Sequence, residues 1–241
     1  MVCEVREYRR YHLTSQDLQL RYSVNPSTFT YLPVKRSPEP ATKASSEASD
    51  KYKRILDAAI EVIAEKGFFH SRVSEIANRA GVADGTIYLY FKNKDELLMA
   101  AIDSAFHGFI GRARLELAKI TDPREKLRKM AFLHLEALGR NRNMAIVFQT
   151  ELRHSAKFLA QFSHNLLVEY FDLIRDVLRE GQEAGVFRPE LPVKIAVNCF
   201  FGAVDEMVTS WILFDKERDY PLSSLADVIV DIVLKGMETK P

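Results

Sequence analysis

Two short amphipathic segments that meet at Gly81 constrain the fold more than any other feature of this sequence. The segment before the glycine carries its apolar residues on one helical face: Val73, Ile76, Ala77 and Ala80. A second short helix is predicted after it, over residues 84–90, with Val82 filling the corner. Two short helices separated by a tight glycine-containing turn form a helix-turn-helix, which places its second helix in the major groove of DNA.

A longer amphipathic helix precedes this motif. Its apolar residues recur at helical spacing: Ile55, Ala58, Ala59, Val62 and Ile63. Gly67 ends the helix, with Lys66 in the last turn, and Ser71 is the expected N-cap of the helix that follows. The sequence therefore predicts a three-helix DNA-binding domain over residues 51–93.

Residues 94–241 show helical periodicity throughout, without strand alternation, so the expected fold class is all-α. Prolines at 123, 189, 192 and 221 mark helix boundaries, because proline is favoured in a first helical turn. The predicted helices cover residues 94–119, 122–140, 143–153, 156–184, 192–215 and 222–238. We expect these six helices to form a ligand-binding and dimerisation domain.

The first 50 residues differ from the rest of the chain. Residues 35–49 are rich in Pro, Ser and Ala and lack apolar periodicity, as in linkers and disordered tails. We interpret residues 1–50 as a disordered arm or an over-called N-terminus. A DNA-contacting arm stays open as an alternative, since Arg9, Arg10, Lys35 and Arg36 are basic.

Composition indicates a cytoplasmic protein. Cys3 and Cys199 lie far apart, which argues against a disulfide framework. No apolar signal core is present, and the apolar run at 195–204 is closed by Lys194 and Asp205, so no membrane partner is expected. The formal net charge is only +1, so any DNA contact must come from a local basic surface.

Such a local excess exists in the predicted head. Between Lys51 and Lys94 there are eight basic and five acidic residues, a modest surplus that makes dimerisation necessary for tight binding. Thr86 offers a hydroxyl and a methyl group to base edges, and Gly85 allows close backbone approach. The predicted DNA-binding residues are Lys51, Lys53, Ser71, Arg72, Asp84, Gly85, Thr86, Tyr88, Tyr90 and Lys94.

A plain helical bundle with tyrosines in its core is the structural alternative. It explains Ile87 and Phe91, but it does not explain polar Thr86, Tyr88 and Lys94 beside a glycine that opens a helix.

These motifs resemble the head of TetR-family transcriptional regulators. The shared elements are Ile-x-x-Ala-Ala at 55–59, Glu-Lys-Gly-Phe at 65–68, Ile-Ala at 76–77, Gly-Val at 81–82, Gly-Thr-Ile-Tyr at 85–88 and Tyr-Phe-x-x-Lys at 90–94. The resemblance implies the TetR fold, a homodimer that binds palindromic operator DNA, and release by a small-molecule effector.

Segments 83–94, 145–153 and 201–211 are also similar to the FadR-like branch of that family. The resemblance implies repression of fatty-acid degradation genes, relieved by long-chain acyl-CoA, with no other cofactor. An acyl chain needs an apolar tunnel, and the CoA phosphates need cations. The predicted ligand-binding residues are Phe109, Arg112, Phe132, Phe148, Gln149, Arg153, Phe201 and Trp211. Ordinary core packing is the alternative for each aromatic residue, and a solvated helix face for each cation.

The last two helices are predicted to form the dimer interface. Apolar residues in the final helix step by three and four, a seam suited to helix–helix packing. The predicted interface residues are Val197, Phe200, Val204, Val208, Leu222, Leu225, Ile229 and Ile232. Packing of these helices within one protomer is the alternative.

Two other functions compete. A regulator of multidrug efflux that senses lipophilic cations would place carboxylates in an aromatic pocket, and Glu151, Asp205 and Glu206 are candidates. An enzyme is disfavoured, because the sequence lacks G-x-S-x-G, P-loop and G-x-G-x-x-G motifs. The six histidines show no H-x-x-x-H spacing, so neither catalytic nor metal-binding residues are predicted.

Overall fold

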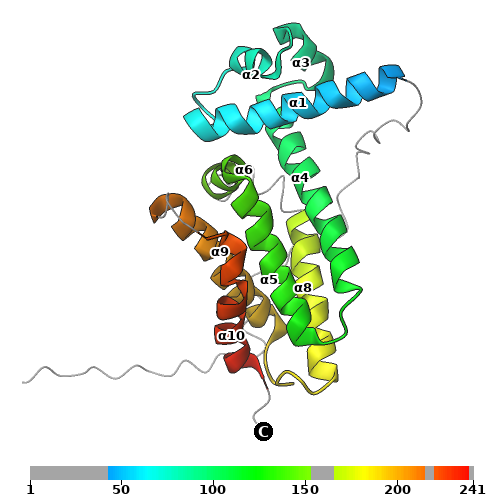
Figure 1. The fold of residues 1–241 in the computed structure, drawn as a ribbon, viewed down its shortest axis with the longest axis vertical. Helices are drawn as coiled ribbons and strands as arrows, with labels where there is room; N and C mark the ends of the chain where they lie inside the picture. The colour runs from blue at the N-terminus through cyan, green and yellow to red at the C-terminus, as the bar shows by residue number, and fades with distance from the viewer. Residues whose placement is uncertain (1–42, 153–165, 215–219, 239–241) are drawn as a thin grey trace, which may run out of the picture. The chain divides into compact units, whose positions relative to one another are not determined.

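The computed structural model describes residues 43–152, 166–214 and 220–238. Within these ranges the regular secondary structure is helical, apart from one β-bridge between Phe187 and Glu238, and short loops join the helices (Figure 1). The head contains α1 (Lys43–Lys66), α2 (Val73–Ala80) and α3 (Asp84–Tyr90). The described body contains α4 (Lys94–Leu117), α5 (Pro123–Arg140), α6 (Arg142–Val147), the π turn η1 (Phe148–Leu152), α8 (Leu166–Glu183), α9 (Val193–Phe214), the 3-10 turn η2 (Leu222–Leu225) and α10 (Ala226–Met237). The predicted all-α fold, with a three-helix head on a helical body, is confirmed.

The first helix begins earlier than expected. It starts at Lys43, eight residues before the predicted boundary at Lys51, so the end of the expected tail is helical. Residues 47–50 are exposed. Exposed residues need no apolar periodicity, so the pattern did not indicate a helix here. The segment is nevertheless helical, because Ala, Glu and Lys are good helix formers. Residues 1–42, and with them the predicted arm, lie outside the described residues.

The helix ends follow local chemistry. Gly67 and Gly81 adopt the left-handed conformation, with φ of 76° and 67°, as required where α1 and α2 end. Asn93 caps α4 by accepting a hydrogen bond from the Glu96 N–H. Ser71 does not cap α2 as predicted, because its hydroxyl is buried and donates to the Phe68 carbonyl at 2.8 Å.

Two hydrophobic cores are present, and the head core extends beyond residue 93. Leu97, Leu98, Ala101 and Ile102 from the start of α4 are buried in it. The end of α6 and the π turn add further members: Val147, Phe148 and Leu152. The body core gathers side chains from α4, α5, α8, α9 and α10. The predicted boundary at residue 93 therefore separates two helices rather than two independent cores.

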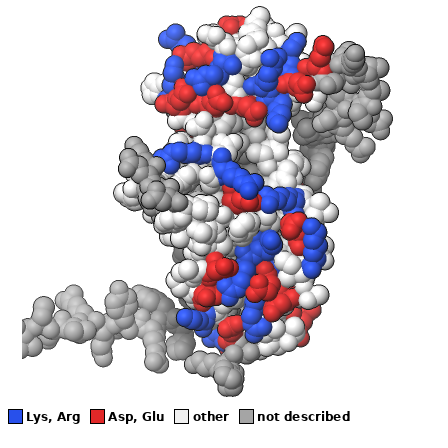
Figure 2. All heavy atoms as spheres, viewed as in Figure 1, with Lys and Arg blue, Asp and Glu red and all other residues white. Residues whose placement is uncertain are grey.

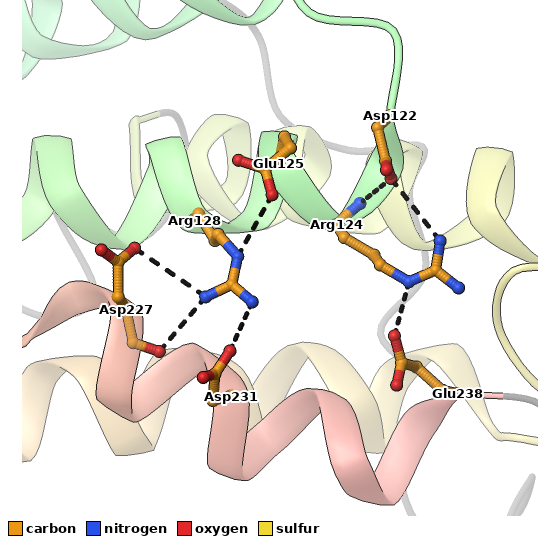
Figure 3. A network of polar contacts seen from close by, with 7 residues as sticks. All are labelled: Asp122, Arg124, Glu125, Arg128, Asp227, Asp231 and Glu238. Atoms are coloured by element: carbon orange, nitrogen blue, oxygen red, sulfur yellow. Dashed lines mark hydrogen bonds and ion pairs between the residues drawn. The ribbon is translucent and has the colours of Figure 1, made fainter.

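A polar network fastens α10 to the start of α5 (Figure 3). Arg128 of α5 pairs with Asp231, and its guanidinium lies 3.2 Å from Glu125 and 3.8 Å from Asp227. Arg124 pairs with Glu238, just after α10. These contacts lie beside the inward side of α10, which consists of buried apolar residues that pack in the body core: Ala226, Ile229, Val230, Leu234 and Met237.

Candidate DNA-binding surface and ligand cavity

Helix α3 is anchored by one side and exposed along the other. Ile87 is buried under the head core, and Phe91 packs just after the helix with its ring against Tyr52. Tyr88 and Leu89 are exposed by 57% and 84%. Gly85 faces open space, since a Cβ atom there would have no neighbour within 4 Å. The exposed side of α3 can therefore approach a duplex closely.

A shallow groove lies beside α3, between the start of α2 and the start of α4. It brings together five of the predicted DNA-binding residues with four neighbours: Ser71, Arg72, Val73, Ser74, Asp84, Tyr88, Lys92, Asn93 and Lys94. Lys53 and Gly85 are exposed, and Lys51 and Thr86 are half-buried. Tyr90 is 37% exposed and packs edge-on against Tyr52. Lys92 and Asn93 are additions to the predicted set.

Several basic side chains of the head are held by acids rather than left for phosphates, and basic and acidic groups adjoin on the face of the head in Figure 2. Lys66 pairs with Glu75 at 2.7 Å, which lowers the pKa of that carboxyl. Arg79 pairs with Glu61 and Glu65, and these hydrogen bonds raise the pKa of its guanidinium. These two cations stabilise the head surface.

Lys94 has a structural role that the sequence did not reveal. Its ammonium donates to the carbonyls of Phe68 and Ser71 and lies 4.4 Å from the centre of the Phe68 ring. Lys94 is among the residues predicted to bind DNA. In the structure, two of its three donors hold the loop between α1 and α2. The hydroxyl of Ser71, engaged with Phe68, is likewise unavailable to DNA.

An apolar cavity of about 160 Å³ lies inside the body. Three predicted aromatic residues line it: Phe109, Phe148 and Phe201. The other lining residues are Ala105, Phe106, His134, Ala137, Leu138, Asn141, Met144 and Tyr170. Aromatic rings from α4, α5, α8, α9 and the π turn therefore surround one space, as an apolar ligand requires.

The remaining predicted ligand residues do not line this cavity. Phe132 lies under the Lys129 ammonium, and Trp211 lies under the Arg142 guanidinium. Gln149 is buried and donates to Asp205. Arg112 is half exposed and pairs with Glu136 at 2.6 Å. Arg153 lies outside the described residues. Periodicity identified these helices as apolar but could not show which of their faces surround the cavity.

Sequence reasoning missed a buried polar cluster in the cavity wall. His134 Nδ1 lies 3.0 Å from the Tyr170 hydroxyl, and its Nε2 lies 3.5 Å from Asp205 Oδ1. Asp205 Oδ1 also accepts from the Gln149 amide at 2.8 Å. Burial raises the pKa of Tyr170, and the Asp205 charge adds to the effect, so the phenol stays protonated. His134 follows Leu127 and Ala131 on one helical face, a signal that could have identified it as buried.

Two arginines are sequence neighbours of a residue that lines the cavity. Asn141 lines the cavity, and its neighbours are Arg140 and Arg142. Glu136 joins Arg140 to Arg112, with contacts of 2.8 and 2.6 Å. Lys and Arg side chains cross this face of the body beneath the head, with few acids between them (Figure 2).

Most of the predicted dimer-interface residues are buried within the protomer's own core. The predicted residues of α9 are 3% exposed or less, because that side of the helix covers the body core: Val197, Phe200, Val204 and Val208. Leu222 and Ile229 are buried in the same core. Leu225 is half-buried, and Ile232 is 69% exposed, so these two remain available.

The opposite faces of α9 and α10 carry exposed apolar side chains. We call this set the outer face: Ile195, Leu213, Phe214, Val228 and Ile232, each more than half exposed. Within the described chain, α9 is the one helix that is long and apolar enough to cross a membrane. Its inner side packs in the body core, so its apolar composition reflects two apolar faces.

The carboxylates of the efflux alternative are not in the cavity. Glu206 is exposed, Asp205 is bonded to Gln149 behind the wall, and Glu151 accepts from the Phe68 N–H of the head. Among the described residues, no group of three or more His, Cys, Asp or Glu could hold a metal ion.

Comparisons with known proteins agree with this architecture. Residues 55–101 match the family described as bacterial regulatory proteins, tetR family, and residues 102–236 match the YsiA-like protein C-terminal region. The fatty acid metabolism regulator protein of Bacillus subtilis is 39% identical over 190 residues, which cover 79% of this chain and 97% of that protein.

Solved structures give the same result. FadR from Bacillus subtilis in complex with stearoyl-CoA is 39% identical, with a TM-score of 0.72, over 77% of this chain and 98% of that chain. FadR from Bacillus halodurans, a fatty acid degradation regulator, has the same identity and TM-score over 77% and 95% of the two chains. The head motifs, the helical body and these matches together establish that the chain belongs to the TetR family of DNA-binding transcriptional regulators.

Proposed function

We propose that this protein is a homodimeric repressor of fatty-acid degradation genes that binds a palindromic operator in the cytoplasm and is released by long-chain acyl-CoA. The observation that carries the proposal is the phenylalanine-lined cavity in the body of a chain 39% identical to a FadR that was solved with stearoyl-CoA. Apolar walls suit an acyl chain, since each buried methylene contributes about 0.8 kcal/mol. The exposed side of α3, with Thr86 and Tyr88, is the proposed base- and phosphate-reading element.

The cations near the cavity support a CoA thioester rather than a free lipid. Arg140 and Arg142 flank cavity-lining Asn141, and Arg112 joins Arg140 through Glu136. Guanidinium groups match phosphate geometry well. We assign the CoA phosphates to this arginine group and the acyl chain to the cavity.

Repression requires a fixed distance between two heads. Paired recognition helices must lie about 34–36 Å apart to enter successive major grooves. The outer face of α9 and α10 is the proposed contact between protomers, because it is an apolar surface at the end of the body core. The cavity, at about 160 Å³, is smaller than the roughly 300–1,000 Å³ typical of ligand pockets, so a long acyl chain must push its walls apart.

Retardation of operator DNA in a gel tests the proposal. Palmitoyl-CoA should release the DNA, whereas free CoA should not, since it lacks the chain that widens the cavity. A complete switch from bound to free needs about a 10⁴-fold preference of the ligand for one state. Equal retardation with and without saturating palmitoyl-CoA would disprove the effector and leave the repressor intact.

The repressor itself is tested at α3. The Thr86→Ala/Tyr88→Phe double variant should lose binding to palindromic duplexes while keeping its fold, because Tyr88 is exposed. Phe132→Leu, in the body and outside the cavity lining, serves as a control. Unchanged operator affinity in the double variant would refute the assigned DNA-reading surface.

A further inference from the structure

The π turn η1 contributes residues to both the cavity wall and the head core. Phe148 lines the cavity, is buried in the head core and stacks on Phe106 with ring centres 5.5 Å apart. Three residues later, Glu151 Oε1 accepts a hydrogen bond from the Phe68 N–H at 3.0 Å. Single π turns inside helices are frequently found at functional sites. Any movement of the cavity wall at Phe148 is thus close to a contact with the head.

The body side of this turn is fixed by the buried polar cluster. Gln149 donates to Asp205, which lies 3.5 Å from His134, and His134 contacts Tyr170. His134 and Tyr170 both line the cavity. A ligand that separates the walls therefore acts on the π turn twice, through the Phe148 ring and through the side chains that hold Gln149.

The head side of the contact is also well defined. Phe68 follows Gly67, whose φ of 76° turns the chain out of α1. The Phe68 carbonyl and that of Ser71 are held by Lys94. Glu151 from the body and Lys94 from α4 thus hold opposite sides of the same peptide segment, directly before the helix-turn-helix. Releasing one of them changes how the α1–α2 loop is supported.

We propose that Glu151 is the positioning residue through which an occupied cavity loosens the DNA-binding head. The inference rests on the proposed function and concerns the regulation of the same site. With the narrow cavity, Glu151 holds the Phe68 N–H and the head is oriented for the operator. When an acyl chain widens the cavity, the π turn shifts and this contact opens. The Glu151–Phe68 bond therefore belongs to the DNA-binding state alone.

The state dependence gives a specific expectation for Glu151→Ala. Removing a bond made only in the DNA-binding state shifts the population toward the released state. Operator affinity without ligand should fall about tenfold, operator affinity at saturating palmitoyl-CoA should stay the same, and palmitoyl-CoA affinity without DNA should rise by a similar factor. The reciprocal change follows from linkage between the two sites.

The experiment measures three dissociation constants on the full-length dimer. These are operator without ligand, operator at saturating palmitoyl-CoA, and palmitoyl-CoA without DNA by calorimetry. Glu151→Gln keeps an acceptor oxygen and should retain most of the operator affinity. Thr150→Ala, in the same π turn, and Glu169→Ala, on α8, are controls that should leave all three constants unchanged.

A structural role alone would give a different pattern. If Glu151→Ala weakens operator binding equally with and without ligand, and leaves palmitoyl-CoA affinity unchanged, the coupling role is refuted. The coupling role is also refuted if Glu151→Gln and Glu151→Ala differ from the wild type in thermal stability alone, with all three dissociation constants unchanged. A wild-type protein that palmitoyl-CoA fails to release would overturn the proposed effector instead, so the two failures are distinct.

Discussion

At the scale of single residues, the head contains two kinds of cation. Lys66 and Arg79 are paired with glutamates, whereas the described neighbours of Arg72 and Lys92 include no ion-pair partner. Only cations that displace counterions contribute to the salt dependence of DNA binding. Paired and unpaired lysines of the same head should therefore differ in how much they contribute to the salt dependence of DNA binding.

Lys92→Gln tests this difference. The slope of log Kobs against log salt should decrease by about 1 per head, and so by about 2 for a dimer, because one phosphate contact is lost in each. Lys66→Gln is the matched control and should leave the slope unchanged. Operator titrations by fluorescence anisotropy at four salt concentrations provide the measurement, and equal slopes for both variants would contradict the assignment.

Lys94→Met should destabilise the head. It removes the donor shared by the Phe68 and Ser71 carbonyls, and each unsatisfied buried polar group costs about 1–3 kcal/mol. Thermal unfolding should show a lower Tm than for Lys53→Met, whose side chain is exposed. The same Tm for both variants would mean that Lys94 is not structural.

The residues of the site were partly predictable. Tyr88 is exposed on α3 and Phe148 lines the cavity, as their positions indicated, because buried neighbours set the phase of each element. The side chains of Ser71 and Lys94 contact carbonyls of the α1–α2 loop, which the sequence did not indicate. A sequence shows that a donor is present, but only the folded backbone shows which carbonyl lies within its reach.

At the scale of elements, two glycines of the helix-turn-helix have different roles. Gly81 needs positive φ to end α2, whereas Gly85 lies in the first turn of α3 with open space around it. Gly81→Ala should lower stability by about 1 kcal/mol, because alanine is strained in that conformation.

Gly85→Ala should keep or raise stability, since alanine favours helix by about 1 kcal/mol. It should nevertheless weaken operator binding, because the added methyl group faces the duplex. Chemical denaturation and operator titration of both variants separate the two effects. Full operator affinity in Gly85→Ala would show that α3 does not approach DNA closely at this residue.

Helix boundaries were predictable wherever a proline, glycine or capping residue marks them. Pro123 follows the capping Asp122, and Gly67 and Gly81 end their helices as expected. The start of α1 was missed because residues 47–50 are exposed and have no apolar phase. The π turn was predicted as ordinary helix, since one extra residue in a turn leaves no mark in a short apolar pattern.

At the scale of the whole molecule, the proposed dimer uses the outer face as its contact. Ile232→Glu places a charge on the proposed contact of α10 without entering the core, since Ile232 is 69% exposed. The variant should sediment as a folded monomer and bind the operator far more weakly, because one head alone loses the gain from bivalency. Glu206→Gln is a mild control on α9. A dimeric Ile232→Glu protein would show that the contact lies elsewhere.

The family resemblance implies a two-fold assembly, but periodicity does not identify its contact face. Helix α9 is apolar on both sides, so Val197 and Phe200 satisfied the pattern as well as Ile195 and Leu213 did. The polar network around Arg128 joins α5 to α10 through residues about 100 positions apart. Such long-range pairs are not visible in a local pattern.

With the proposed dimer contact, the two apolar sides of α9 would link gene dosage to protein lifetime. A chain that has folded but not met a second copy still exposes Ile195, Leu213 and Phe214 to water. Mass action then makes thermal stability rise with protein concentration, and proteases and chaperones act first on unpaired chains. A cell that makes too little of this regulator would therefore lose it faster than dilution alone predicts.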